Sequence, residues 1–193
     1  MKPIADLHLA DLMSPRVQGV APETTVIEAA RRMSDGRISC LVIRQGERLD
    51  GIITERNMVG YVRDRVAPDT PVCELMSTPV VTASSALDIR SAYALLAQHK
   101  VRHLVAVGGG GEILGVVSET DFRSHLGNEV FRTSRDLASV MDVEPLIASS
   151  GSLLEEVIAR MAADGCDYIL AVDDDIAVGI LTERDIPRLL ADG

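Results

Sequence analysis

The chain has 193 residues, and 47% of them are hydrophobic, so it can bury one or two substantial cores. Its formal net charge of −10 argues against a nucleic-acid partner, because binding to phosphates needs a basic face. No apolar stretch approaches the roughly 20 residues that span a bilayer, and residues 1–6 lack the apolar core of a signal peptide, so we expect a cytoplasmic protein without membrane insertion.

In the first 60 residues, one pattern of elements can be followed in chain order. Residues 16–20 are predicted to be extended, and a helix follows over 26–33, where apolar residues recur at i, i+3, i+4 and i+7. A strand-like run at 40–43, a polar turn at 45–48 and a second apolar run predict a hairpin. Residues 54–56 then have the character of the first turn of another helix.

The same order returns twice more along the chain. The matching extended stretches lie at 79–82 and 145–148, the helices at 89–96 and 154–161, and the first strand-like runs at 103–107 and 168–172. A polar signature closes each copy at Asn57, Asp121 and Asp185, with a constant spacing of 64 residues. The copies open on the pairs Leu12-Met13, Leu75-Met76 and Val140-Met141. A fixed period of this size indicates one supersecondary unit copied three times.

Each unit therefore reads β-α-β-β-α, which predicts an α/β (α+β) protein of three tandem repeats. A unit of about 60 residues forms only a marginal core alone, so we expect the units to pack against one another. We assign residues 11–62, 74–126 and 139–190 to the three repeats and residues 1–10 to an N-terminal segment.

This pattern resembles the CBS domain, the cystathionine-β-synthase-type regulatory repeat, over almost the whole chain. The resemblance rests on the opening pairs, on the closing signatures, and on the strand motifs at 37–42 and 101–104. Members of that family pair two repeats through their sheets into a Bateman module, whose clefts hold adenosine-containing ligands such as AMP, ADP, ATP or S-adenosylmethionine. The resemblance implies that the first two repeats pair in this way. The third would pair with another chain, as in a homodimer, or with a missing fourth repeat of a longer protein.

The resemblance also implies a set of ligand-binding residues. The closing Asp would bind the ribose hydroxyls, because a carboxylate accepts two charge-assisted hydrogen bonds at once, and the Ser or Thr would contact phosphate or ribose. For the first cleft the residues are Ser118, Asp121, Ile38, Ser39, Cys40, Arg102 and His103, the last two directed toward phosphate. For the second cleft they are Thr54, Asn57, Val101, Arg102 and His103, and in the third repeat Thr182 and Asp185.

Two positions depart from the family pattern. Asn57 is neutral and offers one acceptor oxygen, so we expect a weaker ribose contact there and a better site at Asp121. Asp167 stands where the second repeat has Arg102, and an acid at this position would repel phosphate. That repulsion favours adenosine or S-adenosylmethionine over a polyphosphate in the third repeat, or no ligand at all.

The leading hypothesis for function is a ligand-sensing regulatory module that transmits ligand occupancy to an attached or associated effector. The alternative is a ligand-free oligomerisation scaffold, because Thr or Ser followed three residues later by Asp or Asn also begins helices without any ligand. No Ser-His-Asp arrangement, metal cluster or paired-carboxylate site is recognisable in the sequence. We therefore expect no enzymatic activity, no obligatory cofactor and no metal site.

Overall fold

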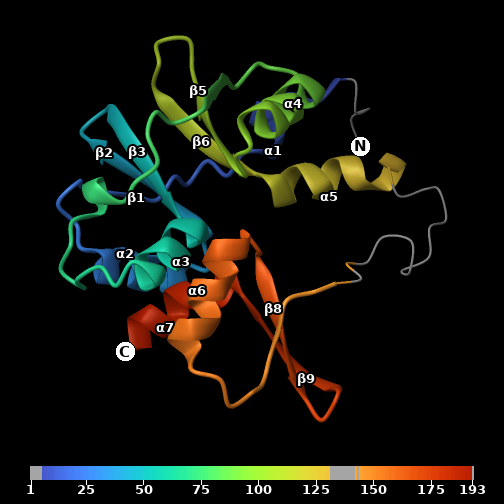
Figure 1. Cartoon of the computed structure of the whole chain (residues 1–193). Helices are drawn as coiled ribbons and strands as arrows, with labels where there is room; N and C mark the ends of the chain where they lie inside the picture. The colour runs from blue at the N-terminus through green and yellow to red at the C-terminus, as the bar shows by residue number, and fades with distance from the viewer. Residues whose placement is uncertain (1–5, 131–141, 143, 193) are drawn as a thin grey trace. The chain divides into compact units, whose positions relative to one another are not determined.

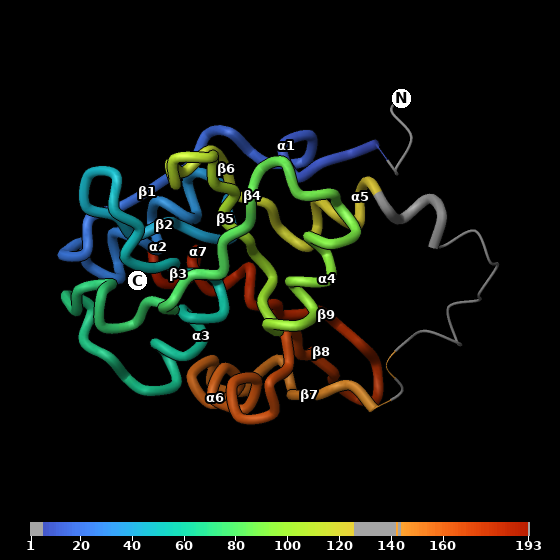
Figure 2. Tube along the Cα trace, turned by 90° about the horizontal axis from the view of Figure 1, so that it is seen from above, coloured from blue at the N-terminus to red at the C-terminus, as the bar shows by residue number. Residues whose placement is uncertain are grey.

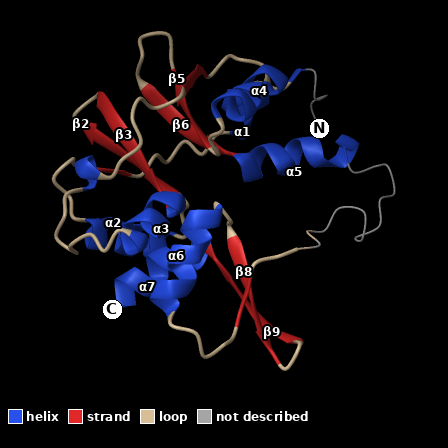
Figure 3. Cartoon of the chain, viewed as in Figure 1, coloured by secondary structure: helices blue, strands red, loops and turns tan. Residues whose placement is uncertain are grey.

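The computed structural model describes residues 6–130, 142 and 144–192 of the chain. Within these residues each repeat forms a three-stranded sheet with its own helices (Figures 1 and 3). The strand orders are β1-β2-β3, β4-β5-β6 and β7-β8-β9, so each sheet follows the order of the chain. The predicted α/β class and the β-α-β-β-α order of the three repeats are confirmed.

The elements have the following bounds. The first repeat contains β1 (Gly19–Val20), α2 (Val26–Gly36), β2 (Cys40–Gln45), β3 (Arg48–Thr54) and α3 (Glu55–Arg63). The second contains β4 (Thr82–Ser84), α4 (Ile89–His99), β5 (His103–Val107), β6 (Ile113–Ser118) and α5 (Glu119–Val130). The third contains β7 (Ile147–Ala148), α6 (Leu154–Asp164), β8 (Tyr168–Asp173), β9 (Ile176–Thr182), the 3-10 turn η4 (Glu183–Asp185) and α7 (Ile186–Asp192). A short helix, α1 (Leu9–Leu12), precedes the first repeat, and a 3-10 turn, η2 (Val72–Glu74), precedes the second.

Local sequence explains where the first helix of each repeat begins and ends. The side chain of Thr25 caps α2 by accepting a hydrogen bond from the Glu28 N–H at 3.3 Å. At their C-terminal ends α2, α4 and α6 stop at Arg37, Lys100 and Gly165, which all have left-handed backbone conformations. This cap turns the chain back toward the next strand. Among the described helices, none combines the length and the apolar character needed to cross a membrane.

The strand pairing repeats from copy to copy. β5 and β6 pair antiparallel as a hairpin, and β4 adds to β5 in parallel. β7, β8 and β9 pair in the same way in the third repeat. The hairpin of the second repeat turns at residues 108–111, where the Gly111 N–H donates to the Gly108 carbonyl at 3.1 Å. The glycine run at these residues is thus a strand connection.

The chain divides into two compact units, and their make-up does not follow the order of the repeats. One unit consists of residues 1–19, 45–49 and 79–141, and it holds the second repeat with the segment that precedes the first. The other consists of residues 20–44, 50–78 and 142–193, and it holds the first and third repeats with the segment that precedes the second.

Within the second of these units, the first and third repeats pack together through helices. α2 contacts α7, and α3 contacts α6 (Figures 1 and 3). Fully or almost fully buried residues of both repeats share one hydrophobic core, in which Ile158 and Ile186 of the third repeat join Ala29, Met33 and Met58 of the first. This packing gives the third repeat a partner inside the same chain for its helices.

In the other unit, the segment before the first repeat completes the second repeat. α1 lies against α5 and β6 (Figure 2), and Leu9 and Leu12 belong to the core that contains Phe122. Ser14 continues along β6, where its N–H donates to the Val116 carbonyl at 2.9 Å. The pair at residues 12–13, which opens the first repeat in the sequence, therefore packs in the core of the second repeat.

The segment before the second repeat packs in turn against the first repeat. Val72 is buried in the core of the first repeat, and Leu75 and Met76 pack against it. Ser77 bridges to Ile52 of β3, with hydrogen bonds of 2.8 and 3.1 Å in the two directions. The first two repeats thus exchange their leading segments. The third opening pair, Val140-Met141, lies outside the described residues.

Candidate ligand-binding sites

A single backbone hydrogen bond holds each signature beside the start of a strand. The N–H of the first residue after the second hairpin strand donates to the carbonyl of the residue that precedes the first hairpin strand. The three pairs are Glu55 to Ser39 at 3.1 Å, Glu119 to Arg102 at 2.8 Å and Glu183 to Asp167 at 3.0 Å. The signatures of the first two repeats therefore lie next to strand-start residues that the resemblance assigned to ligand binding, and the third lies next to Asp167 at the matching position.

In the second repeat, Ser118 fixes one oxygen of the Asp121 carboxylate. The Ser118 N–H donates to Oδ2 at 2.8 Å, and the Ser118 hydroxyl donates to the same oxygen at 2.6 Å. The side chain of Asp121 is half-buried. Its other oxygen, Oδ1, makes no hydrogen bond to any residue that the structure describes. The arrangement leaves a positioned carboxylate oxygen that can accept hydrogen bonds from a hydroxylated ligand.

His103 lies directly opposite Ser118 in the β5–β6 pairing and shares the environment of Asp121. Burial, and to a smaller extent the positive charge of Arg102, lower the pKa of His103 to about 4, while the negative charge of Asp121 acts in the opposite direction. The imidazole is therefore neutral at neutral pH. It can hydrogen-bond to a ligand, but Arg102 is the residue that supplies positive charge at this strand start.

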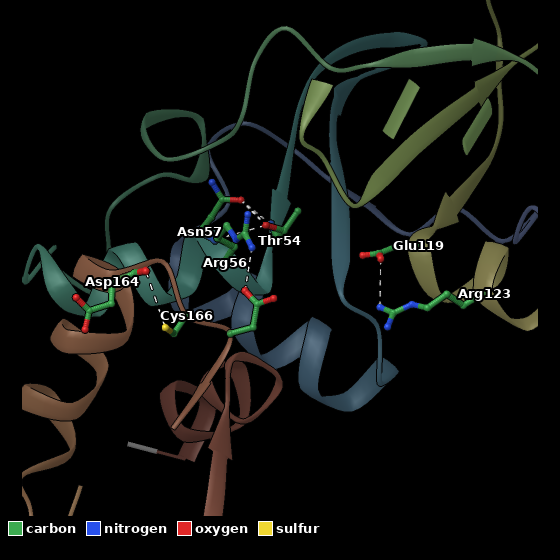
Figure 4. A network of polar contacts seen from close by, with 8 residues as sticks. Thr54, Arg56, Asn57, Glu119, Arg123, Asp164 and Cys166 are labelled. Atoms are coloured by element: carbon green, nitrogen blue, oxygen red, sulfur yellow. Dashed lines mark hydrogen bonds and ion pairs between the residues drawn. The ribbon is translucent and has the colours of Figure 1, made fainter. Parts of the chain in front are cut away.

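In the first repeat, Asn57 uses its whole amide group within the protein. Its Oδ1 accepts hydrogen bonds from the Thr54 N–H at 2.9 Å and the Thr54 hydroxyl at 2.7 Å (Figure 4). Its Nδ2 donates to the Leu75 carbonyl at 3.0 Å and to the Ser77 hydroxyl at 3.3 Å. An aspartate could not donate these last two bonds. The departure from the family pattern therefore has a structural reason, which is the anchoring of the segment before the second repeat.

The third repeat keeps the aspartate and resembles the second. Asp185 Oδ2 accepts from the Thr182 N–H and from the Thr182 hydroxyl, both at 2.9 Å. Asp185 Oδ1 lies 3.7 Å from a guanidinium nitrogen of Arg188, whose side chain is largely exposed. The second oxygen of this carboxylate thus has a weak ionic neighbour that Asp121 lacks among the described residues.

The acid at position 167 is paired with a residue of the first signature. Arg56 Nη2 lies 2.8 Å from Asp167 Oδ1, and both side chains are about half exposed. The sequence predicts that Asp167 repels phosphate, but no motif predicts its partner. The guanidinium compensates much of the carboxylate charge, because the two groups are in contact.

The remaining predicted residues fall into two groups. Val101, Arg102 and His103 lie with Ser118 and Asp121 in one unit, and all five are half-buried. Ile38, Ser39 and Cys40 lie at the start of β2 in the other unit, together with Thr54 and Asn57. The predicted residues of the first repeat thus lie together in one unit, and those of the second repeat lie together in the other. The combination of two halves in one cleft stays a prediction.

The comparisons with known protein sequences identify one family. The family model for the CBS domain matches residues 9–64, 72–128 and 136–192. The CBS domain-containing protein YhcV of Bacillus subtilis is 32% identical over 125 residues, which cover 62% of this chain and 86% of that protein. L-aspartate semialdehyde sulfurtransferase of Methanocaldococcus jannaschii is 28% identical over 147 residues, which cover 73% of this chain but 28% of the enzyme. A 33.4 kDa protein in the ribosomal RNA operon of Thermofilum pendens is matched over 47% of its length.

Solved structures share the same fold. Protein MJ1225 from Methanocaldococcus jannaschii, which has been proposed as an archaeal homologue of g-AMPK, aligns with a TM-score of 0.81 at 21% identity, over 95% of this chain and 72% of that one. The CBS domain pair of protein MJ0100, in complex with 5′-methylthioadenosine and S-adenosyl-L-methionine, aligns with a TM-score of 0.59 at 18% identity, over 64% of this chain and 98% of that one. With three matched segments that account for most of its length, the chain belongs to the CBS-domain family.

Proposed function

We propose that this protein is a regulatory module whose second repeat binds an adenosine-containing ligand through Asp121. The proposal rests on the different hydrogen bonding of the two carboxylate oxygens. Ser118 donates two hydrogen bonds to Oδ2, while Oδ1 has no hydrogen bond to the described residues. Such a carboxylate is suited to ribose hydroxyls, because each charge-assisted hydrogen bond contributes roughly 1.5–3 kcal/mol.

The candidate ligands are AMP, ADP, ATP and S-adenosylmethionine. The complex of the MJ0100 domain pair with two adenosyl compounds supports this class of ligand. The neutral state of His103 and the net charge of −10 disfavour a ligand with several negative charges. We therefore rank S-adenosylmethionine and AMP above ADP and ATP.

We further propose that ligand occupancy is transmitted to an effector, which is attached to the chain or associated with it. A ligand can shift the arrangement of the repeats only by the difference between its affinities for the two arrangements. The same signature residues also cap helices, so a scaffold without a ligand is the alternative outcome of the binding experiment.

Calorimetry on the Asp121→Asn variant tests the proposal. Asn57 makes the same two bonds to Thr54 that Asp121 makes to Ser118, so Asn is expected to keep the local fold at position 121. It replaces an acceptor oxygen by a donor nitrogen and removes the charge. We expect the dissociation constant of the preferred ligand to rise by at least about tenfold, which corresponds to the loss of one charged hydrogen bond.

Asp88→Asn is the matched control for the change of charge. Asp88 caps α4 in the same repeat by accepting from the Ser91 N–H at 3.0 Å, and Asn caps helices equally well. This variant should bind the ligand as the wild type does. If none of the four ligands binds to the wild type or raises its melting temperature, the sensing proposal fails and the scaffold alternative stands.

A further inference from the structure

A groove of about 620 Å³ lies between helices of the unit that holds the first and third repeats. It is formed by α3 with the turn after it, by the start of α6 and by α7, and α3 contacts both other helices (Figure 1). Its aliphatic lining consists of Val62, Val66, Leu154, Ile158, Ile186, Leu189 and Leu190. A mostly apolar cavity of roughly 300–1,000 Å³ has the usual size and character of a site for a small organic molecule.

The lining continues from the shared hydrophobic core to the protein surface. Ile158 and Ile186 line the groove and are almost completely buried, whereas Leu154 lines it at the start of α6 and is 44% exposed. Val62 comes from the first repeat, and the other three come from the third. A molecule in this groove would therefore contact both repeats at once.

Tyr61 supplies the hydroxyl group of the groove. Only 6% of its surface is exposed, and the hydroxyl makes no hydrogen bond to a residue that the structure describes, although a buried tyrosine usually has a partner. Burial raises the pKa of Tyr61, and the negative charge of Asp69 adds to this effect. Tyr61 therefore keeps its proton at neutral pH and can donate a hydrogen bond to a ligand.

Arg65 supplies positive charge in the turn after α3. Its Nε donates to the carboxylate of Glu155 in α6, and both residues line the groove with side chains that are more than half exposed. This bond uses a single N–H of the guanidinium. The two terminal nitrogens make no hydrogen bond to the described residues. Their N–H groups are therefore available to an acidic ligand.

We propose that this groove binds a small organic acid with an apolar body, whose carboxylate contacts Arg65 and Tyr61. The body would lie against the aliphatic lining. Glu155 limits the ligand to a single acidic group, because its carboxylate repels further negative charge. Decanoate is a simple molecule with this chemistry and serves as the probe. The inference is independent of the ligand at Asp121, which lies in the other unit.

Calorimetry with decanoate on the full chain, well below its micelle concentration, tests the class of ligand. The dissociation constant should fall several-fold with every two CH₂ groups from hexanoate to octanoate to decanoate, because each adds buried apolar surface. 1-Decanol has the same chain without the charge and should bind at least about tenfold more weakly. If neither decanoate nor 1-decanol binds, the inference is wrong, and an apolar segment of another protein remains as the occupant.

Two substitutions in the ion pair should change the binding of decanoate in opposite directions. Arg65→Gln removes the positive charge and should raise the dissociation constant by at least about tenfold. Glu155→Gln removes the competing negative charge and should lower the dissociation constant by about twofold to fivefold. A groove that had merely lost its shape would bind decanoate more weakly in both variants.

Arg63→Gln is the matched control for the loss of positive charge. Arg63 lies two residues before Arg65, pairs with Asp64 and is not part of the lining. This variant should bind decanoate as the wild type does. Tyr61→Phe keeps the ring in the groove and removes only the hydroxyl, so it should raise the dissociation constant by about threefold to tenfold.

Two further results would overturn the inference. Equal binding of decanoate by the wild type and Arg65→Gln would place the acid elsewhere. Loss of decanoate binding in Asp121→Asn would place the probe at the candidate adenosine site. Failure of the adenosine-containing ligands at Asp121 would leave the results with decanoate unchanged, so the two proposals fail separately.

Discussion

The three signatures differ in one side chain, and their hydrogen bonds differ with it. Asp121 and Asp185 accept two bonds on one oxygen, and the other oxygen makes no hydrogen bond to the described residues. Asn57 accepts the same two bonds but adds donors, which reach Leu75 and Ser77. The side chain at this position therefore holds the segment that precedes the second repeat, instead of offering a free acceptor oxygen to a ligand.

The Asn57→Asp variant should therefore destabilise the first repeat, although aspartate is the usual residue of the family. A carboxylate oxygen would face the Leu75 carbonyl, and two donors would be lost, which costs about 1–3 kcal/mol. Urea unfolding at neutral pH would measure this loss. The loss should shrink as the pH falls toward the pKa of the new carboxyl group, because protonation restores one donor.

Asp185→Asn is the opposite exchange and serves as its control. Asp185 Oδ1 has only the distant Arg188 as a charged neighbour among the described residues, so this variant should change stability by less than about 0.5 kcal/mol. Equal stability of wild type and Asn57→Asp at neutral pH would show that the contacts with the 75–77 segment contribute nothing measurable.

The sequence predicts which residue types stand at these positions, but it predicts their hydrogen bonds and protonation states poorly. A weaker ribose contact at Asn57 follows from its neutral amide, whereas its bonds to Leu75 depend on a chain segment that the fold brings back. The sequence also suggests His103 as a basic group directed toward phosphate. Its pKa of about 4 results from burial, which no local pattern reveals.

At the scale of elements, the close approach of a methionine to a strand glycine joins each leading segment to its sheet. Met13 lies so near Gly115 that a Cβ there would be within 2.9 Å of three Met13 side-chain atoms. Gly115 does not have a left-handed backbone conformation, so space alone requires glycine at this position.

We accordingly expect Gly115→Val to destabilise the second repeat by about 1–3 kcal/mol, since overpacking forces Met13 out of its place. Gly179→Val offers a matched control in the third repeat, where the nearest atom of the described residues is 3.9 Å away, and it should cost much less. Chemical denaturation of both variants would compare these two losses. Equal losses would mean that Met13 moves aside without cost.

Local sequence patterns predict the helices and strands, but they do not predict that the first two repeats exchange their leading segments. Helical spacing at i, i+3, i+4 and i+7 and the alternation of apolar runs with turns predict the β-α-β-β-α order, because these patterns act over a few residues. By chain order, Leu12 and Met13 open the first repeat, yet they pack in the second. That outcome depends on contacts across some 100 residues, which periodicity does not encode.

At the scale of the whole molecule, the union of the first and third repeats rests on apolar helix packing. Ile158 and Ile186 are almost completely buried in the core of the first repeat. The ion pairs that link the same repeats, Arg56 with Asp167 and Arg65 with Glu155, are largely exposed and contribute little. The sequence predicts apolar helix faces but not the choice of partner, because any of the three repeats offers a similar face.

Hydrogen exchange on an Ile186→Ala variant would test this union. Ile186 has no exposed surface, so its truncation should cost about 2–4 kcal/mol. Because its neighbours include the core of the first repeat, amide protection should fall in α2 and α3 as well as in α6. The amides of β5 and β6 belong to the other unit and should keep their protection.

Leu104→Ala provides the reciprocal control, since Leu104 is fully buried in the core of the second repeat. It should lower protection in α4, β5 and β6 and leave α6 and α7 as they are. Loss of protection in the third repeat alone after Ile186→Ala would mean that its helices rest on the first repeat without stabilising it. Equal loss in all three repeats would contradict the division into two cooperative units, because a single unit transmits one truncation throughout.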